Sequence, residues 1–221
     1  MADVVVRGLT AERVRANLAE VDERIAAAAA RAGRGRAGVE LVAAVKYVPE
    51  QELGALAQAG VKIAGENRAQ DLKAKVAAYG DAFVWDFFGH VQSRKVRDVA
   101  PLVRLIHSVS TDSVLEQLRR HAPPQLRVLV EVNVAGEEHK GGVAPAELDA
   151  FIARCPVAVA GLMTMPPLSD EPEDSRRWFA ALRELADARD LPELSMGTTQ
   201  DFEVAVEEGA TIVRIGTRLF Q

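Results

Sequence analysis

The chain has 221 residues, of which 48% are hydrophobic and 27% are charged, and this composition is typical of a soluble globular protein of one domain. The formal net charge of −5 excludes a general attraction to nucleic acid or to anionic lipid, and we expect neither nucleic acid nor a membrane as a partner. The single cysteine, Cys155, excludes an internal disulfide and disfavours a thiolate metal site, so we expect a cytoplasmic protein without a metal.

A long helix is predicted over residues 10–32, because Thr10 can cap it and apolar residues recur at helical spacing between Val14 and Ile25. From residue 39 onward, short β-branched runs alternate with helical stretches. We predict strands at residues 39–45, 61–64, 83–88, 103–107, 126–134, 157–162, 193–195 and 211–215. We predict helices between them at residues 49–59, 66–79, 91–99, 111–121, 145–154, 172–189 and 199–208.

Eight strands separated by helices predict a parallel sheet, because most of these strands are apolar on both faces. A closed (β/α)8 TIM barrel with an extra N-terminal helix accounts for the number of strands, and we expect residues 1–221 to form this single domain. An open doubly wound sheet is the alternative. Such a sheet normally carries a glycine-rich loop after its first strand, where this chain has Lys46-Tyr47-Val48-Pro49.

Lys46 ends the first predicted strand with an amine, although lysine is rarely buried without a partner. A lysine at a strand end can simply extend its ammonium group into solvent. In its neutral form, the same amine condenses with an aldehyde or a ketone to give a Schiff base. The residues at the other strand ends favour this second interpretation.

Polar residues end or follow most of the other predicted strands, and in a barrel these ends meet at the face where active sites lie. They are Asn67, His90, Ser108, Asn133, Thr164, Ser195 and Arg214. Each has an ordinary structural explanation by itself, such as a helix cap or a turn. Together they predict a ring of polar groups around Lys46, and therefore a ligand site.

The last two strands predict a phosphate site. The segments Ser195-Met196-Gly197-Thr198-Thr199 and Ile215-Gly216-Thr217 place glycines and hydroxyl groups at two neighbouring strand ends. The helix predicted to begin near Thr199 would add its positive end, and barrels commonly bind phosphate after strands seven and eight. Two ordinary tight turns are the alternative interpretation.

A Schiff-base lysine and a phosphate site describe two kinds of ligand. One is a phosphorylated sugar aldehyde or ketone, as in an aldolase, and the other is pyridoxal 5′-phosphate (PLP). Arg214 favours PLP, because a guanidinium at the base of the site can donate to the pyridine nitrogen and discourage its protonation. A ring held in this way withdraws electrons poorly, which favours a racemase-like or non-catalytic protein over a transaminase.

Several motifs resemble the YggS/PROSC family of PLP homeostasis proteins, and they occur in that family's order. They are Val45-Lys46-Tyr47, Gly65-Glu66-Asn67, Trp85-Asp86-Phe87-Phe88-Gly89-His90-Val91-Gln92-Ser93, Gly161-Leu162-Met163-Thr164-Met165, Leu194-Ser195-Met196-Gly197 and Val213-Arg214-Ile215-Gly216-Thr217. The resemblance covers almost the whole chain and implies a barrel like the N-terminal domain of alanine racemase. It also implies a protein that binds, stores and delivers PLP without established turnover, and we expect a monomer that serves apo PLP-dependent enzymes.

The same resemblance implies a set of PLP-binding residues. Lys46 matches the lysine of the internal aldimine, and Arg214 matches the arginine that faces the pyridine nitrogen. The matches to the phosphate binders are Ser195, Gly216 and Thr217, with Met196 beside them, and the matches to residues near the ring are Asn67, His90 and Asn133. The chain has Thr198-Thr199 where relatives have Met-Ser, and the retained hydroxyl groups predict that phosphate binding survives.

Two further expectations concern activity. A weakly active single-domain racemase is the alternative function, but it needs a second acid/base group, and Tyr47 should point away from Lys46 along an extended strand. Lys140 lies in the charged loop after the fifth strand. It is either an exposed loop residue or the group that receives the aldehyde during hand-over.

Overall fold

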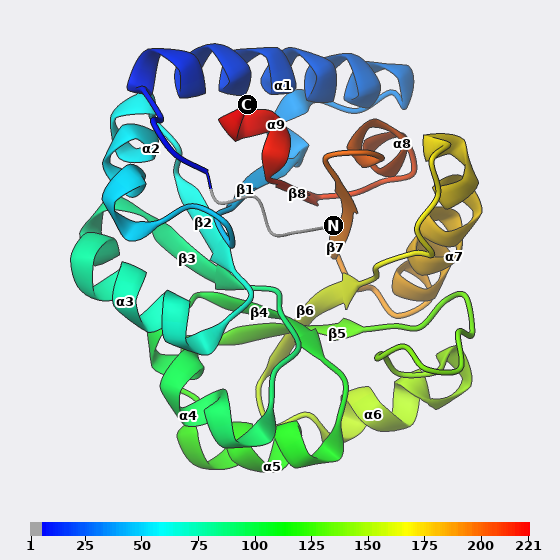
Figure 1. Cartoon of the computed structure of the whole chain (residues 1–221). Helices are drawn as coiled ribbons and strands as arrows, with labels where there is room; N and C mark the ends of the chain where they lie inside the picture. Colours follow the sequence, from blue (N-terminus) through cyan, green and yellow to red (C-terminus); the bar gives the residue numbers. More distant parts are fainter. Residues whose placement is uncertain (1–5) are drawn as a thin grey trace.

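The computed structural model describes residues 6–221, in which eight parallel strands close into a barrel in chain order (Figure 1). The strands are β1 (Glu40–Ala44), β2 (Ile63–Glu66), β3 (Val84–Phe87), β4 (Leu105–Val109), β5 (Arg127–Glu131), β6 (Ala158–Met163), β7 (Glu193–Thr198) and β8 (Ile212–Ile215). Strand β8 closes the ring on β1, where Val42 is in register with Arg214. The (β/α)8 barrel expected from the sequence is confirmed.

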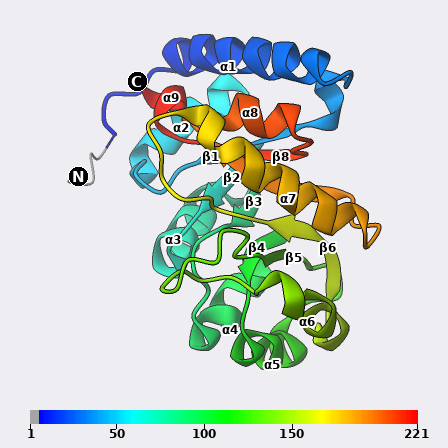
Figure 2. The same cartoon turned by 90° about the vertical axis from the view of Figure 1, so that its right-hand side faces the viewer.

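Helices connect the strands on the outside of the barrel, and the expected N-terminal helix precedes them. They are α1 (Ala11–Arg31), α2 (Leu53–Ala59), α3 (Ala69–Tyr79), α4 (Val96–Val99), α5 (Asp112–His121), α6 (Leu148–Arg154), α7 (Arg176–Asp187), α8 (Phe202–Glu207) and α9 (Thr217–Phe220). Thr10 caps α1 as predicted, because its side chain accepts from Arg13 N at 3.3 Å. Helix α1 buries Val14, Val21 and Ile25 and packs against α2, α8 and α9 (Figures 1 and 2).

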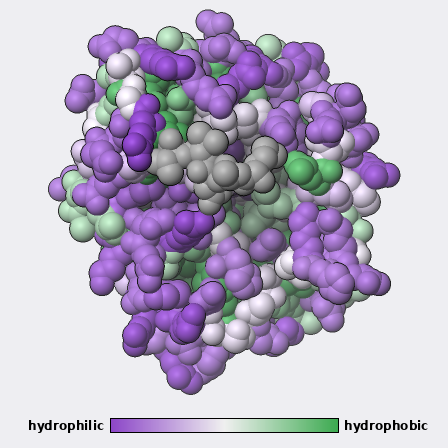
Figure 3. All heavy atoms as spheres, in the orientation of Figure 1, coloured by the Kyte–Doolittle hydropathy of each residue, from purple (hydrophilic) through white to green (hydrophobic). Residues whose placement is uncertain are grey.

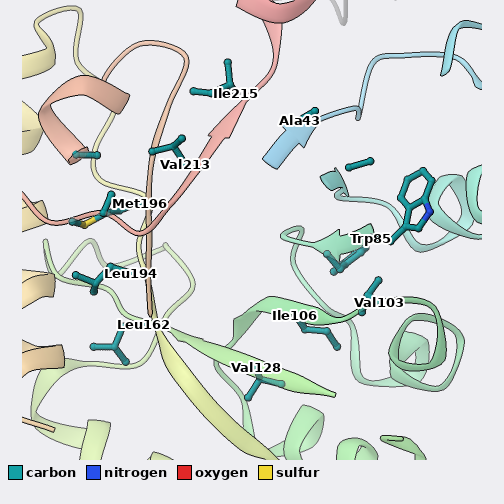
Figure 4. Close-up of a cluster of buried hydrophobic side chains, with 14 of the residues drawn as sticks. Ala43, Trp85, Val103, Ile106, Val128, Leu162, Leu194, Met196, Val213 and Ile215 are labelled. Carbon is teal, nitrogen blue, oxygen red and sulfur yellow. The ribbon is translucent and has the colours of Figure 1, made fainter. Parts of the chain in front are cut away.

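Most of the hydrophobic core lies between the strands and the helices. Figure 4 shows Trp85, Val128 and Leu162 among the side chains that belong to this outer layer. Inside the barrel a smaller apolar group is formed by Val42, Leu105, Leu129, Met163 and Ile212. Full burial of one such side chain stabilises the fold by about 1.5–3 kcal/mol. The outer layer therefore contributes most of the hydrophobic stabilisation, while the interior also holds buried charged groups.

The end of β1 differs from the prediction. The strand stops at Ala44, and the chain then turns, because Val48 N donates to Val45 O at 2.9 Å. Side chains alternate between faces only while a strand is extended. The expectation that Tyr47 points away from Lys46 is therefore wrong, and the two side chains are in contact.

The end of β7 differs as well. Helix α8 begins at Phe202 with Asp201 as its N-cap, rather than near Thr199. The predicted positive helix end at Thr199 is therefore corrected to a loop. After Gly216, the short helix α9 was not predicted, because four residues are too few to give a periodic pattern.

Candidate functional site

Lys46 lies in the turn that follows β1, at the carboxyl ends of the barrel strands. Its side chain is half-buried, and Nζ is 4.9 Å from the centroid of the Tyr47 ring. That distance is typical of a cation–π contact, so the ring lies beside the amine. The structure thus places the predicted nucleophile where active sites of barrels lie.

A buried ion pair fixes the backbone next to Lys46. Lys75 Nζ, on α3, is 2.5 Å from Glu66 Oε1 and donates to Val45 O at 2.7 Å. The Lys75 and Glu66 side chains are 7% and 0% exposed. The other carboxylate oxygen of Glu66 accepts from the next two backbone N–H groups at 2.6 and 3.1 Å. Because the two charges are paired with each other and each also has backbone hydrogen-bond partners, they can be buried. They tie β1, β2 and α3 together beneath Lys46.

Asn67 and His90 line a cavity of about 210 Å³ that lies beside the starts of α3 and α4. Asn67 Oδ1 is buried and has no hydrogen-bond partner within residues 6–221, whereas His90 is exposed. A Cβ atom on Gly89 would lie 2.0 Å from Asn67 O, so only glycine allows the two loops to approach this closely. Asn67 therefore presents an unused acceptor in a fixed loop.

Arg214 lies inside the barrel and is 4% exposed. Its Nη1 donates to Ser195 Oγ, and its Nη2 donates to Thr164 O at 3.1 Å and contacts Met165 Sδ. Within residues 6–221 these partners are all uncharged. Burial lowers the pKa of Arg214 to about 10, against the opposing effect of nearby carboxylates, so the guanidinium remains a cation at neutral pH. The site therefore has a buried positive charge with no carboxylate in contact.

Ser195 links Arg214 to a chain of hydrogen-bonded side chains inside the barrel, which runs through His107 to Asp86. Its Oγ is 2.8 Å from His107 Nδ1, and His107 Nε2 is 3.2 Å from Asp86 Oδ2. Ser195, His107 and Asp86 are all 0% exposed. Burial lowers the pKa of His107, although Asp86 acts in the opposite direction. Ser195, predicted as a phosphate binder, thus uses its hydroxyl group inside the barrel.

This chain of hydrogen bonds continues through Arg104 toward the amino ends of the strands. This side chain donates to both oxygens of Asp86, at 2.9 and 3.2 Å, and to Glu40, whose carboxylate is half-exposed. Burial raises the pKa of Asp86, but the hydrogen bonds from His107 and Arg104 outweigh it, and the net effect is a lowered pKa. Sequence reasoning did not find this chain of hydrogen bonds. The available signal was a charged or polar residue inside an apolar strand, at Asp86 and at His107.

The carboxyl ends of β7 and β8 meet through Thr199, whose Oγ1 accepts from Gly216 N at 3.2 Å. Thr217 is exposed and begins α9. Thr198 donates from its N and Oγ1 to Asp201 Oδ1, at 2.7 and 3.0 Å. Hydroxyl groups therefore gather at this edge as the sequence predicted, but Thr199 supplies the one that bridges the two loops.

Three other residues singled out in the sequence have local roles in the structure. The Met196 side chain is fully buried in the outer core (Figure 4), so toward the mouth it offers main-chain atoms only. Asn133 exchanges hydrogen bonds with the backbone of Glu137 at 2.9 and 3.1 Å. Lys140 Nζ is 2.7 Å from Glu137 Oε2 and donates to Pro166 O at 3.1 Å. For Asn133 and Lys140, a role toward PLP stays a prediction.

Glu131 is a site residue that sequence reasoning missed. It ends β5, which lies opposite β1 in the eight-stranded ring. Burial raises the pKa of its carboxyl group, and Arg214, His90 and Lys140 act in the opposite direction. The sequence predicts Asn133 as a site residue, and side chains two positions apart on a strand lie on the same face. This alternation could have identified Glu131 as a second site residue.

These residues fit a polar ligand such as PLP. The observation that carries this is the buried Arg214 charge, which contacts no carboxylate within the described part of the chain. Asn67 Oδ1 also lacks a hydrogen-bond partner there, but the cavity beside it is lined by neither Lys46 nor Arg214. Buried polar groups usually find partners, and a ligand can supply them. Lys46 adds an amine for an aldehyde, and Thr199 and Thr217 add hydroxyl groups for a phosphate.

The face seen in Figure 3 is covered mainly by hydrophilic residues. Across residues 6–221, no helix combines the length and the apolar character needed to cross a bilayer. In the same range, no three His, Cys, Asp or Glu side chains are grouped so that they could hold a metal ion.

Comparison with known proteins places the chain among PLP-related barrels. Residues 16–221 match the family described as alanine racemase, N-terminal domain. The pyridoxal phosphate homeostasis protein of Aquifex aeolicus is 45% identical over 217 residues, which cover 92% of this chain and 95% of that protein. The protein of the same name from Pseudomonas aeruginosa is 39% identical over 214 residues, with 92% and 93% covered.

A solved structure agrees with these relatives. PipY of Synechococcus elongatus, with PLP bound, has 31% sequence identity and a TM-score of 0.75, and the match covers 91% of this chain and all of that one. The structure of PipY without PLP matches with a TM-score of 0.81. The similarity therefore extends over nearly the whole barrel in both sequence and structure.

Proposed function

The chain belongs to the family of pyridoxal phosphate homeostasis proteins, and on this premise we propose that it holds PLP through Lys46 and serves intracellular vitamin B6 homeostasis. The observation that carries the proposal is the arrangement of a half-buried amine and a buried, carboxylate-free cation at one barrel mouth. PipY, which is similar over nearly the whole chain, has been solved with PLP bound.

Each group of residues has a distinct part in the proposed binding. The aldehyde of PLP supplies the carbon that condenses with an amine, and Lys46 provides that amine. Arg214 would face the ring nitrogen. Gly216, Thr217 and Thr199 would hold the phosphate through N–H and hydroxyl groups, for which the Gly216 N–H would have to leave its present acceptor, Thr199 Oγ1. We include five further predicted residues in the proposed PLP site, at the positions described above. They are Asn67, His90, Asn133, Ser195 and Met196.

The proposed function is carriage rather than turnover. We expect a cytoplasmic monomer that delivers PLP to apo-enzymes, and we expect residues 1–221 to act as one PLP-binding domain. The support for a single domain is that the barrel uses strands from Glu40 to Ile215, with α1 packed against α2, α8 and α9. The electron-poor ring needed for transamination is disfavoured by a permanently charged Arg214.

Titration of the purified protein with PLP tests this proposal. We expect a yellow protein whose absorption band is lost on reduction with borohydride. Peptide mapping should then find the added mass on Lys46 among the six lysines of the chain. An adduct on another lysine, or labelling that requires a sugar phosphate instead of PLP, would contradict the proposal, and the second result would indicate an aldolase.

The racemase alternative predicts exchange of the α-hydrogen of an amino acid. We expect PLP-loaded protein in D₂O to exchange the α-hydrogen of alanine or serine no faster than PLP with free lysine does, as followed by proton NMR. The reason is that Tyr47 lies beside Lys46, so it does not supply a second acid/base group across the mouth from that amine. Exchange well above that background would favour the racemase.

A further inference from the structure

The guanidinium of Arg214 depends on a hydroxyl group for its orientation. Its Nη1 donates to Ser195 Oγ, and both side chains are buried. A buried cation is costly unless its donors meet acceptors. A hydroxyl oxygen serves as an acceptor in a defined direction only if its own proton is directed elsewhere. The orientation of the Ser195 O–H therefore decides how well Arg214 is held.

His107 provides the acceptor for that proton. Ser195 Oγ is 2.8 Å from His107 Nδ1. Since Arg214 already donates to Oγ, the Ser195 O–H is free to donate to Nδ1, provided that Nδ1 carries no hydrogen. The proton of a neutral imidazole then resides on Nε2, and Nε2 lies 3.2 Å from Asp86 Oδ2. The three contacts are consistent with one tautomer.

Asp86 fixes this tautomer because it stays a charged acceptor. Arg104 donates to both of its oxygens, at 2.9 and 3.2 Å, and Arg104 is held in turn by Glu40. A carboxylate held in this way accepts hydrogen bonds and has none to donate. A hydrogen on Nδ1 would leave Ser195 with two donors pointing at its oxygen and no acceptor for its own proton. The donors therefore converge on Asp86: the hydrogen bonds run from Arg214 through Ser195 and His107 to Asp86, and from Arg104 to Asp86 on the other side.

We infer that His107, fixed by Asp86 as the neutral Nε2–H tautomer, is a positioning residue that makes Ser195 an acceptor for Arg214 and thereby directs the Arg214 guanidinium at the bound cofactor. The inference rests on the proposed function as far as the cofactor is concerned. The tautomer and the orientation of the hydroxyl group are properties of the protein alone. They can be tested without PLP.

The first measurement uses the wild-type protein without PLP. In ¹⁵N-labelled protein at pH 7.5, we expect the His107 resonances of an imidazole with hydrogen on Nε2 and none on Nδ1, assigned by their loss in His107→Gln. A signal from Nδ1–H, or from a doubly protonated ring, would overturn the inference whether or not the protein binds PLP.

The second measurement compares variants by PLP affinity and by the absorption maximum of the bound cofactor. His107→Leu and Ser195→Ala each remove the acceptor arrangement, and we expect each to weaken PLP binding by about 10-fold, as for the loss of one hydrogen bond to a charged group, and to shift the absorption band. His107→Gln retains an acceptor and a donor on one side chain, so we expect affinity within about 3-fold of wild type and an unshifted band.

The outcomes separate a positioning role from a structural one and from failure of the proposed function. If His107→Leu does not fold, Ser195→Ala still removes the hydroxyl group with a smaller change. Folded variants that keep wild-type affinity and the wild-type band would overturn the inference, even if their melting temperatures fall. If wild-type protein binds no PLP, the proposed function fails, and the tautomer measurement alone decides the inference.

Discussion

Lys46→Ala is expected to abolish the covalent attachment of PLP to this protein. The yellow band and the borohydride-trapped mass should both disappear, because within residues 6–221 Lys46 is the lysine that closely follows a barrel strand at this end. Noncovalent affinity through Arg214 and the phosphate-binding loops should remain but weaken by at least about 10-fold, which corresponds to the loss of roughly 1.4 kcal/mol. The measurements are a PLP titration followed by absorption and intact-protein mass after reduction.

Lys73→Ala is the matched control, because Lys73 is exposed on α3 and has the same side chain. We expect it to behave as wild type in both measurements. The melting temperature of Lys46→Ala should also stay close to that of wild type, since a half-exposed turn residue contributes little to stability. If Lys46→Ala still forms the adduct, PLP attaches to another lysine, and the assignment to Lys46 is wrong.

The other lysines explain why position 46 is distinctive. Lys75 is buried in an ion pair, and Lys140 is held by Glu137 and Pro166. Lys95 lies 3.8 Å from Asp98, and Lys62 and Lys73 are exposed outside the mouth. Lys46 combines partial burial with a position at a strand end of a barrel, which is where ligands bind.

The barrel and the place of Lys46 could be predicted from sequence because both depend on local patterns. Alternation of apolar runs with helical stretches fixes the number of strands, and the residues after each run are then known to share one face. The orientation of Tyr47 could not be predicted in this way. It depends on the turn after Ala44, which is set by a hydrogen bond from Val48 and by Lys75, a residue 30 positions away from Val45.

The hydrogen-bonded chain from Arg214 to Glu40 could not be predicted from sequence for a related reason. Its members come from β8, β7, β4, β3 and β1 and from Arg104 just before β4, and they meet only when the barrel closes. A single charged residue in an apolar run, such as Asp86, indicates that the strand carries a buried charge. It does not indicate which residue pairs with that charge. The motif around Ser195 predicts a phosphate binder, and that role stays a prediction. The partners of its hydroxyl group inside the barrel, His107 and Arg214, could not be read from the motif.

Lys75→Met should have the largest effect on stability among the substitutions considered. Removing one partner of a buried ion pair typically costs about 3–5 kcal/mol, because the other charge is left uncompensated. Here the uncompensated group is Glu66, which is 0% exposed. Among residues 6–221 it keeps the two backbone N–H donors that follow it. For a chain of this size, a loss of that magnitude lowers the melting temperature by roughly 10 °C. Urea denaturation followed by circular dichroism measures the free energy of unfolding directly.

Two further variants make the cause specific. Lys73→Met places the same change on the exposed side of α3 and should alter the free energy of unfolding by no more than about 0.5 kcal/mol. Lys75→Met combined with Glu66→Gln removes both charges, so it should recover part of the loss seen in Lys75→Met alone. If the double variant is as unstable as the sum of its single changes, the pair is not coupled. The support beneath Lys46 would then come from the Lys75 hydrogen bond to Val45 O rather than from the buried charges.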